Sequence, residues 1–156
     1  MTGRGPRGSE GQAAVELEQR ADPAERGAYR ASVDPGAAGP GGEAGPLRVR
    51  GADLVRAAAE DLLAGAAPPV IAARFHRGVA AAIAEVCAAL RERSGLETVA
   101  LSGGVFQNLL LLGQVVDGLE ASGFRVLTHA RVPPNDGGIS LGQAVVAGAR
   151  DRRDER

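Results

Sequence analysis

Two stretches of this chain have the pattern of buried β-strands, and they flank a single helical segment. Thr98–Leu101 (TVAL) is a short apolar run that ends at a Ser-Gly-Gly turn. Phe124–Thr128 (FRVLT) follows the apolar helical pattern of Val105–Ala121. A strand, a helix and a strand with short connections predict a βαβ unit with parallel strands. Parallel sheets are normally wider than two strands and covered on both faces, so we expect part of an α/β domain.

Helical patterns dominate the rest of residues 50–150. Between Pro68 and Arg93, apolar residues recur every three or four positions, which predicts one long amphipathic helix. Ala52–Leu63 and Ile139–Ala149 predict two further helices. Together these elements predict a helix-rich α/β fold with a short parallel βαβ unit.

The two ends of the chain have a different composition. Residues 22–47 hold six Gly and four Pro, too little apolar surface to offset the entropy lost on ordering. We therefore expect residues 1–49 to be a mostly disordered Gly/Pro/Ala-rich segment with a short helix near 11–20. We assign residues 50–150 to one ordered lobe and residues 151–156 to a charged tail.

Composition excludes several classes of function. The 156 residues suffice for one domain at most. The net charge of -1 gives no reason to expect binding to nucleic acid or to an anionic membrane. All 18 basic residues are Arg, so neither a P-loop lysine nor a Schiff base is available. A single Cys excludes an internal disulfide, and no apolar run is long enough for a transmembrane helix or a signal peptide, so we expect a cytoplasmic protein.

The first candidate site is the turn between the first strand and the following helix. Gly103 and Gly104 lack a Cβ and allow a ligand to approach the backbone, and a helix N-terminus offers free N–H groups. Asn108 lies about one turn further on and could reach the same crevice. This pattern fits a phosphate or ribose site without Lys. A strand–helix turn with no ligand is the alternative, and glycine pairs are common in such turns.

The second candidate site follows the second strand and contains Asp136, within VPPNDGG. The carboxyl ends of parallel strands share one edge, where open α/β sheets bind ligands. Asp136 could ligate a metal or Mg²⁺ held by phosphates. Alternatively, Asn135 or Asp136 caps a helix, and both interpretations can hold together. We interpret His76, His129 and Cys87 as structural, although His129 lies near the predicted crevice.

Four segments together resemble the C-terminal part of the hydrogenase maturation carbamoyltransferase family, HypF. They are Glu10–Glu18 (EGQAAVELE), Ala73–His76 (ARFH), Val99–Asn108 (VALSGGVFQN) and Val132–Gln143 (VPPNDGGISLGQ), and their order and approximate spacing also match. The resemblance covers roughly residues 10–20 and 50–150.

This resemblance implies a fold, a reaction and a set of ligands. The family belongs to the actin-like, sugar-kinase/Hsp70-like ATPases and is related to the tRNA threonylcarbamoyl-transfer enzymes. Its members make carbamoyl-adenylate from ATP and carbamoyl phosphate, and pass the carbamoyl group to the C-terminal Cys of HypE in [NiFe]-hydrogenase maturation. By the motif matches, Gly11, Gly103, Gly104 and Asn108 correspond to nucleotide contacts and Asp136 to a ligand of a divalent metal.

The resemblance also implies that this chain carries only part of the enzyme. The family's acylphosphatase-like domain, zinc fingers, adenylate-forming domain and paired metal-binding His are not in this sequence, and Ser9 stands where the family has Tyr. We therefore expect a lobe that is inactive alone and needs the N-terminal part of the enzyme as a partner. A non-catalytic remnant or interaction module, with at most weak nucleotide binding, is the alternative.

Overall fold

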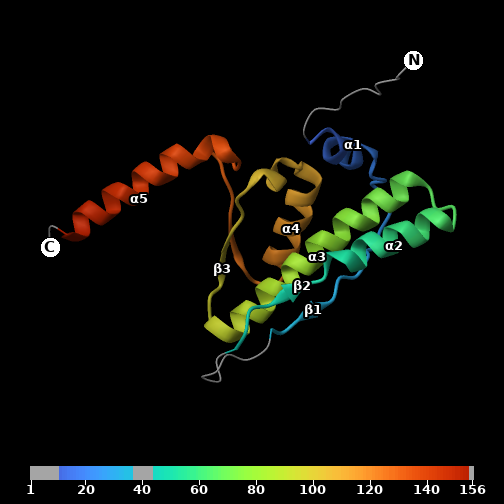
Figure 1. The fold of residues 1–156 in the computed structure, drawn as a ribbon, viewed down its shortest axis with the longest axis horizontal. Helices are drawn as coiled ribbons and strands as arrows, with labels where there is room; N and C mark the ends of the chain where they lie inside the picture. The colour runs from blue at the N-terminus through green and yellow to red at the C-terminus, as the bar shows by residue number, and fades with distance from the viewer. Residues whose placement is uncertain (1–10, 37–43, 155–156) are drawn as a thin grey trace, which may run out of the picture.

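The computed structural model describes residues 11–36 and 44–154. Its longest element is α3 (Pro68–Ser94), against which α2 (Gly51–Leu63) and α4 (Leu109–Ala121) pack. Figure 1 shows α2 running alongside α3, while α4 covers another side of it. The short helix α1 (Gln12–Arg20), which the sequence predicts near residues 11–20, also contacts α3. Helix α3 is therefore the centre of the molecule.

Small residues make this central position possible. Small side chains let neighbouring elements come close, and apart from His76 the buried residues of α3 are all Ala or Gly: Ala72, Ala73, Gly78, Ala80 and Ala82. The apolar residues at the three-to-four-residue spacing are mostly half-buried. The helix is thus as long as predicted, but its most buried residues lie beside the apolar residues that recur every three or four positions.

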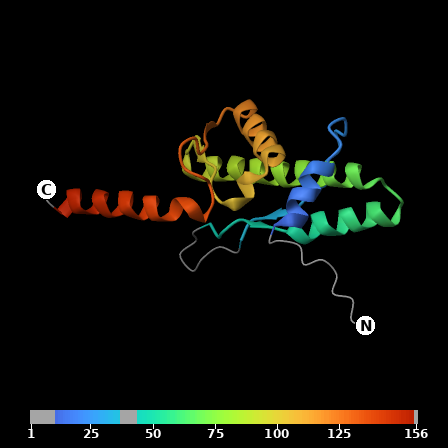
Figure 2. The same cartoon turned by 90° about the horizontal axis from the view of Figure 1, so that it is seen from above.

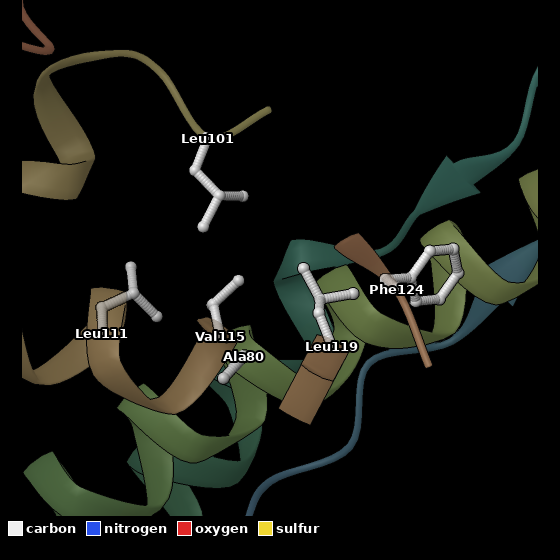
Figure 3. Close-up of a cluster of buried hydrophobic side chains, with 6 residues drawn as sticks. All are labelled: Ala80, Leu101, Leu111, Val115, Leu119 and Phe124. Carbon is white, nitrogen blue, oxygen red and sulfur yellow. The ribbon is translucent and has the colours of Figure 1, made fainter. Parts of the chain in front are cut away.

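The hydrophobic core lies between α3, α4 and the two parallel strands. Figure 3 shows its buried side chains, which are Ala80, Leu101, Leu111, Val115, Leu119 and Phe124. Val115 and Leu119 are almost completely buried. Of the six buried side chains only Phe124 is aromatic, and Phe106 packs against them as a partly buried ring, as a sequence poor in aromatic residues requires.

The predicted βαβ unit is present. Strands β3 (Thr98–Ala100) and β4 (Arg125–Leu127) are parallel, with Val99 paired to Val126, and α4 connects them. The helix predicted over Val105–Ala121 is divided, because Asn108 has extended backbone and caps α4. Before it, η1 (Gly104–Gln107) forms a turn of 3-10 helix.

The segment after α1 differs from the disordered linker that its composition predicts. Residues 22–36 follow the surface of α3, and β1 (Val33–Asp34) pairs antiparallel with β2 (Arg48–Val49). Polar contacts order this segment: the N–H of Tyr29 donates to the Arg74 carbonyl, and that of Asp22 donates to the Pro69 carbonyl. Composition could not reveal these contacts, because they join residues far apart in sequence. The predictions for residues 1–10 and 37–43 lie outside the described residues.

The C-terminal helix is longer than predicted and stands apart. Helix α5 (Ile139–Asp154) follows the 3-10 turn η2 (Asp136–Gly138) and includes most of the expected charged tail. No Gly or Pro interrupts the chain beyond Ala149, so nothing local ends the helix earlier. Figure 2 shows α5 projecting away from the other helices. None of the helices in the described ranges is long and apolar enough to cross a membrane.

Candidate functional site

The two predicted ligand loops meet at the carboxyl ends of β3 and β4. The Gly103 N–H donates a hydrogen bond to the Pro134 carbonyl oxygen over 2.7 Å. A Cβ placed on Gly104 would lie 3.9 Å from that of Asn135, so the loops are in van der Waals range. Gly103 has φ +108°, a conformation that side-chain-bearing residues rarely adopt. The expected convergence of the two loops is therefore present in the structure.

Three of the predicted nucleotide contacts line one pocket. Gly11, Gly104 and Asn108 surround a cavity of about 530 Å³ between α1 and η1. This volume lies within the usual range for small-molecule sites. In the described part of the chain, the N–H groups of Gly104 and Val105 have no hydrogen-bond partner, and both residues line this cavity. Gly103 lies next to the lining rather than in it.

Asn108 stabilises the wall of this pocket that lies opposite α1. Its Oδ1 accepts a hydrogen bond from the Leu111 N–H over 2.8 Å, which caps α4. Its Nδ2 lies 2.8 Å from Nε2 of His76. Because Nδ2 can only donate, this bond assigns an unprotonated Nε2 to His76, with the proton on Nδ1 facing the Ala72 carbonyl 2.8 Å away. His76 is buried and fully hydrogen-bonded, which confirms its interpretation as a structural residue.

The N-terminus of α4, which begins four residues later than the predicted helix, has its first N–H groups already occupied. Glu18 Oε1 accepts hydrogen bonds from the N–H of Leu109 over 2.7 Å and of Leu110 over 3.2 Å. Asn108 accepts from Leu111, as described above. A carboxylate from α1 thus occupies the first donors of α4, whereas the N–H groups of Gly104 and Val105, where the sequence predicts the helix to begin, have no partner among the described residues. Glu18 lies in the EGQAAVELE segment, but nothing local in the sequence indicates a partner 91 residues away.

Asp136 is exposed at the start of η2 and lies outside the lining of the pocket. The capping role goes to its neighbour Asn135, whose Oδ1 accepts from the Gly137 N–H over 3.1 Å. The Asp136 carboxylate has no hydrogen bond among the residues the structure describes, so it could receive a cation. Within those same residues, no group of three or more His, Cys, Asp or Glu is placed to hold a metal. Asp136 could therefore supply one ligand but not a complete metal site.

A serine–histidine contact lies at the same edge. His129 Nε2 is 2.9 Å from Ser102 Oγ, and both residues are exposed. Ser102 follows β3 and His129 follows β4, so the parallel pairing of the strands brings them together. Sequence reasoning placed His129 near the crevice but did not identify Ser102 as its partner.

A polar cluster of Glu25, Tyr29, Asp61 and Arg74 joins the segment after α1 to α2 and α3. The Tyr29 hydroxyl donates to Asp61 over 2.7 Å, and Arg74 binds the same carboxylate over 2.8 Å. Burial, followed by the contact with Asp61, raises the pKa of Tyr29 to about 12. The hydrogen bonds from Tyr29 and Arg74 lower the pKa of Asp61. The Gly27 N–H, followed by lesser contributions that include Arg74, lowers the pKa of Glu25. This cluster orders the segment that follows α1.

The chain matches one protein family over most of its length. Residues 3–143 match the family described as the carbamoyltransferase Kae1-like domain, second subdomain. The chain is 43% identical over 89 residues to carbamoyltransferase HypF of Rhodobacter capsulatus. It is 31% identical over 93 residues to the probable carbamoyltransferase HypF of Methanocaldococcus jannaschii. These matches cover 57% and 60% of this chain but only 12% of each relative.

Solved structures show the same relationship. Full-length HypF in a phosphate- and nucleotide-bound form superimposes with a TM-score of 0.77 and 36% identity, over 88% of this chain and 17% of that structure. HypF of T. kodakarensis gives a TM-score of 0.74 and 28% identity, over 92% of this chain and 17% of that one. The chain therefore spans a small C-terminal part of these enzymes, and it belongs to the HypF carbamoyltransferase family.

Proposed function

We propose that this chain is the nucleotide-binding C-terminal lobe of a HypF-like carbamoyltransferase with an actin-like ATPase fold. One observation carries the proposal: Gly11, Gly104 and Asn108, from segments far apart in the sequence, line a single cavity. The motif resemblance assigns the same three residues to nucleotide contacts. The nucleotide-bound form of a related structure, full-length HypF, supports ATP as the ligand.

The residues of the pocket suit a nucleotide for physical reasons. Gly11 and Gly104 leave the backbone accessible on two opposite walls, and Gly103 joins one wall to the loop that carries Asp136. The polar backbone can bind phosphate or ribose oxygens without Lys. Asp136 is the proposed ligand of a divalent cation, whose other ligands would come from the nucleotide phosphates or from residues outside those the structure describes.

The reaction proposed for the assembled enzyme is that of its family. A carbamoyl group passes from carbamoyl phosphate, through carbamoyl-adenylate, to the C-terminal Cys thiol of a HypE-like acceptor. This chain contributes the cavity between α1 and η1, and a single lobe cannot align ATP, the carbamoyl group and the thiol together. We therefore propose that turnover requires the remaining HypF domains, supplied with or beside this lobe.

Calorimetric titration of the purified chain with magnesium ATP tests nucleotide binding. We expect saturable binding that Gly104→Val weakens, because a branched side chain would enter the cavity. The matched variant Gly142→Val lies on α5, where an added Cβ meets nothing, and it is expected to leave binding unchanged. Saturable binding that Gly104→Val does not affect would place the nucleotide elsewhere and contradict the proposed site.

The alternative is an interaction module without catalysis. The position of Asp136 outside the cavity lining and the absence of a metal-ligand group in the described residues favour this alternative. Mass spectrometry of a HypE-like acceptor distinguishes the two. We expect a carbamoyl adduct on its C-terminal Cys when this chain, the remaining HypF domains, ATP and carbamoyl phosphate are all present. An adduct that forms equally well without this chain would favour the non-catalytic module.

A further inference from the structure

We propose that Glu18 is a positioning residue that sets the width of the nucleotide pocket by fastening α1 to the start of α4. The inference rests on the proposed function, because it assumes that the cavity between α1 and η1 binds a nucleotide. It assigns a role to a side chain that neither the glycine-rich turn nor the Asp136 loop includes.

First, the hydrogen bonds of Glu18 are the main contact that holds α1 against α4 in the described residues. None of the nine residues of α1 is buried; Leu17 is half-buried, and the helix packs on α3 rather than on α4. Glu18 is half-buried, and its Oε1 receives two backbone hydrogen bonds from the first turn of α4. Hydrogen bonds to a charged carboxylate are stronger than those between neutral groups. The contact between these helices therefore depends strongly on one side chain.

The second observation is what this contact positions. Gly11 is the N-cap of α1, and it forms one wall of the cavity, whereas Gly104 and Asn108 form the other. Glu18 itself lines this cavity and a neighbouring one of about 800 Å³. Both cavities are also lined by Val15, Gln19 and Gln107. Glu18 thus lies where two open spaces beside α1 adjoin. If the carboxylate released α4, α1 would still rest on α3, but its tie to α4 would be lost and Gly11 would no longer be held at a fixed distance from Gly104.

The third observation concerns charge. The N-terminus of a helix carries a partial positive charge and attracts anions. In this structure the Glu18 carboxylate already supplies that anion for α4. A phosphate of the bound nucleotide is therefore excluded from α4, and only the backbone of the preceding glycine turn remains accessible on this wall. Glu18 both fixes the pocket and limits where a phosphate can lie within it.

Three substitutions separate the position of the oxygen from its charge. Glu18→Asp keeps the charge but is one methylene too short to reach α4. Glu18→Gln keeps the length and one acceptor oxygen without the charge, and Glu18→Ala removes both. Glu120→Ala removes a carboxylate from the exposed far end of α4 and serves as the matched control.

The experiment measures two quantities on the full chain, with circular dichroism to confirm that each variant is folded. Amide hydrogen exchange at Leu109 and Leu110 reports the contact directly, and calorimetry with magnesium ATP reports the pocket. For Glu18→Asp and Glu18→Ala we expect faster exchange at both amides and an affinity for ATP about ten-fold lower. We expect Glu18→Gln to recover most of both properties and Glu120→Ala to change neither.

The outcomes separate this inference from the proposed function. If the native chain binds ATP and Glu18→Asp binds it equally well, the role of Glu18 is overturned while the nucleotide site stands. If Glu18→Gln binds ATP as weakly as Glu18→Ala, charge rather than position is decisive, and the positioning role is likewise overturned. If the native chain shows no saturable ATP binding, the nucleotide site fails, and the role of Glu18 fails with it.

Discussion

The Gly103 N–H and the Pro134 carbonyl oxygen lie 2.7 Å apart, and their hydrogen bond joins the loops that follow β3 and β4. These loops lie in two of the four segments that resemble the HypF family, Val99–Asn108 and Val132–Gln143. Because the strands are parallel and adjacent, the loops leave the sheet at one edge. The hydrogen bond therefore holds the two loops side by side, as the parallel strands predict, and the prediction that both loops serve one site stays a prediction.

Gly103→Ala tests the conformation on which this hydrogen bond depends. At φ +108°, an alanine would be strained, although its Cβ would meet no other atom within 4 Å. We expect the substitution to lower the free energy of unfolding by about 1–3 kcal/mol, as measured by urea denaturation. Gly113→Ala is the control, because Gly113 lies inside α4 and has equally open space around it. We expect that control to raise stability by about 0.5–1 kcal/mol. Equal stability of Gly103→Ala and the native chain would contradict the strained conformation.

Gly78→Ala tests the ordering of the segment after α1. A Cβ on Gly78 would lie 2.7 Å from the Tyr29 carbonyl oxygen and 3.0 Å from Leu54, so the backbone of the segment would have to move. We expect a loss of about 1–3 kcal/mol in the free energy of unfolding. Gly118→Ala on α4 meets nothing within 4 Å and is the comparison. If residues 22–36 were a disordered linker, Gly78→Ala would instead stabilise α3.

Tyr29→Phe tests the polar cluster, and the contribution of the Tyr29 hydroxyl to stability is expected to depend on pH. Near neutral pH we expect the loss of the hydroxyl to lower stability by about 1 kcal/mol. The pKa of Tyr29 is about 12 in the folded chain and 10.0 ordinarily, so its contribution is complete below about pH 10. That contribution is lost as the pH rises through 12. The stability difference between native chain and variant should therefore shrink between about pH 10 and 12, and a difference that grows over this range would contradict the assigned environment.

The same linkage argument has the opposite sign for the acidic partner. The pKa of Asp61 is lowered on folding, so its contribution is present above its ordinary pKa of 3.8 and is lost as the pH falls through the lower folded value.

Asn108→Ala tests the wall of the pocket that lies opposite α1. The substitution removes the cap of α4 and leaves the buried Nε2 of His76 without a donor, so we expect a loss of about 2–4 kcal/mol. Asn108→Ser restores a capping oxygen but does not reach His76, and it should recover about half of that loss. Thermal and urea unfolding of both variants provide the measurement. Identical stabilities of Ala and Ser variants would show that the cap contributes nothing.

The fold could be predicted where neighbouring residues determine it. Apolar spacing predicted α3 closely, and the sharp change to a short apolar run followed by glycines predicted β3 and its turn. The strand β4 and the parallel pairing followed from the same reasoning. The beginning of α4 could not be placed, because the helical pattern continues through Val105, and only the cap formed by Asn108 shows where the helix begins.

Contacts between distant segments account for what the sequence could not predict. The Gly/Pro-rich segment is ordered by bonds from Tyr29 and Asp22 to α2 and α3, which composition cannot reveal. The same limit applies at the site. Sequence reasoning identified Gly11, Gly104 and Asn108, which share the cavity, but it could not show that Glu18 occupies the first donors of α4 from 91 residues away. The role of Asp136 in metal binding stays a prediction.

Amide chemical-shift mapping of the full chain during a titration with magnesium ATP tests the central claim most directly. The account predicts saturable shifts at Gly11, Gly104 and Asn108, which line the cavity on both walls, and little change along the projecting helix α5. Shifts that stay absent at saturating ATP, or that cluster on α5 while these three amides remain unchanged, would contradict it.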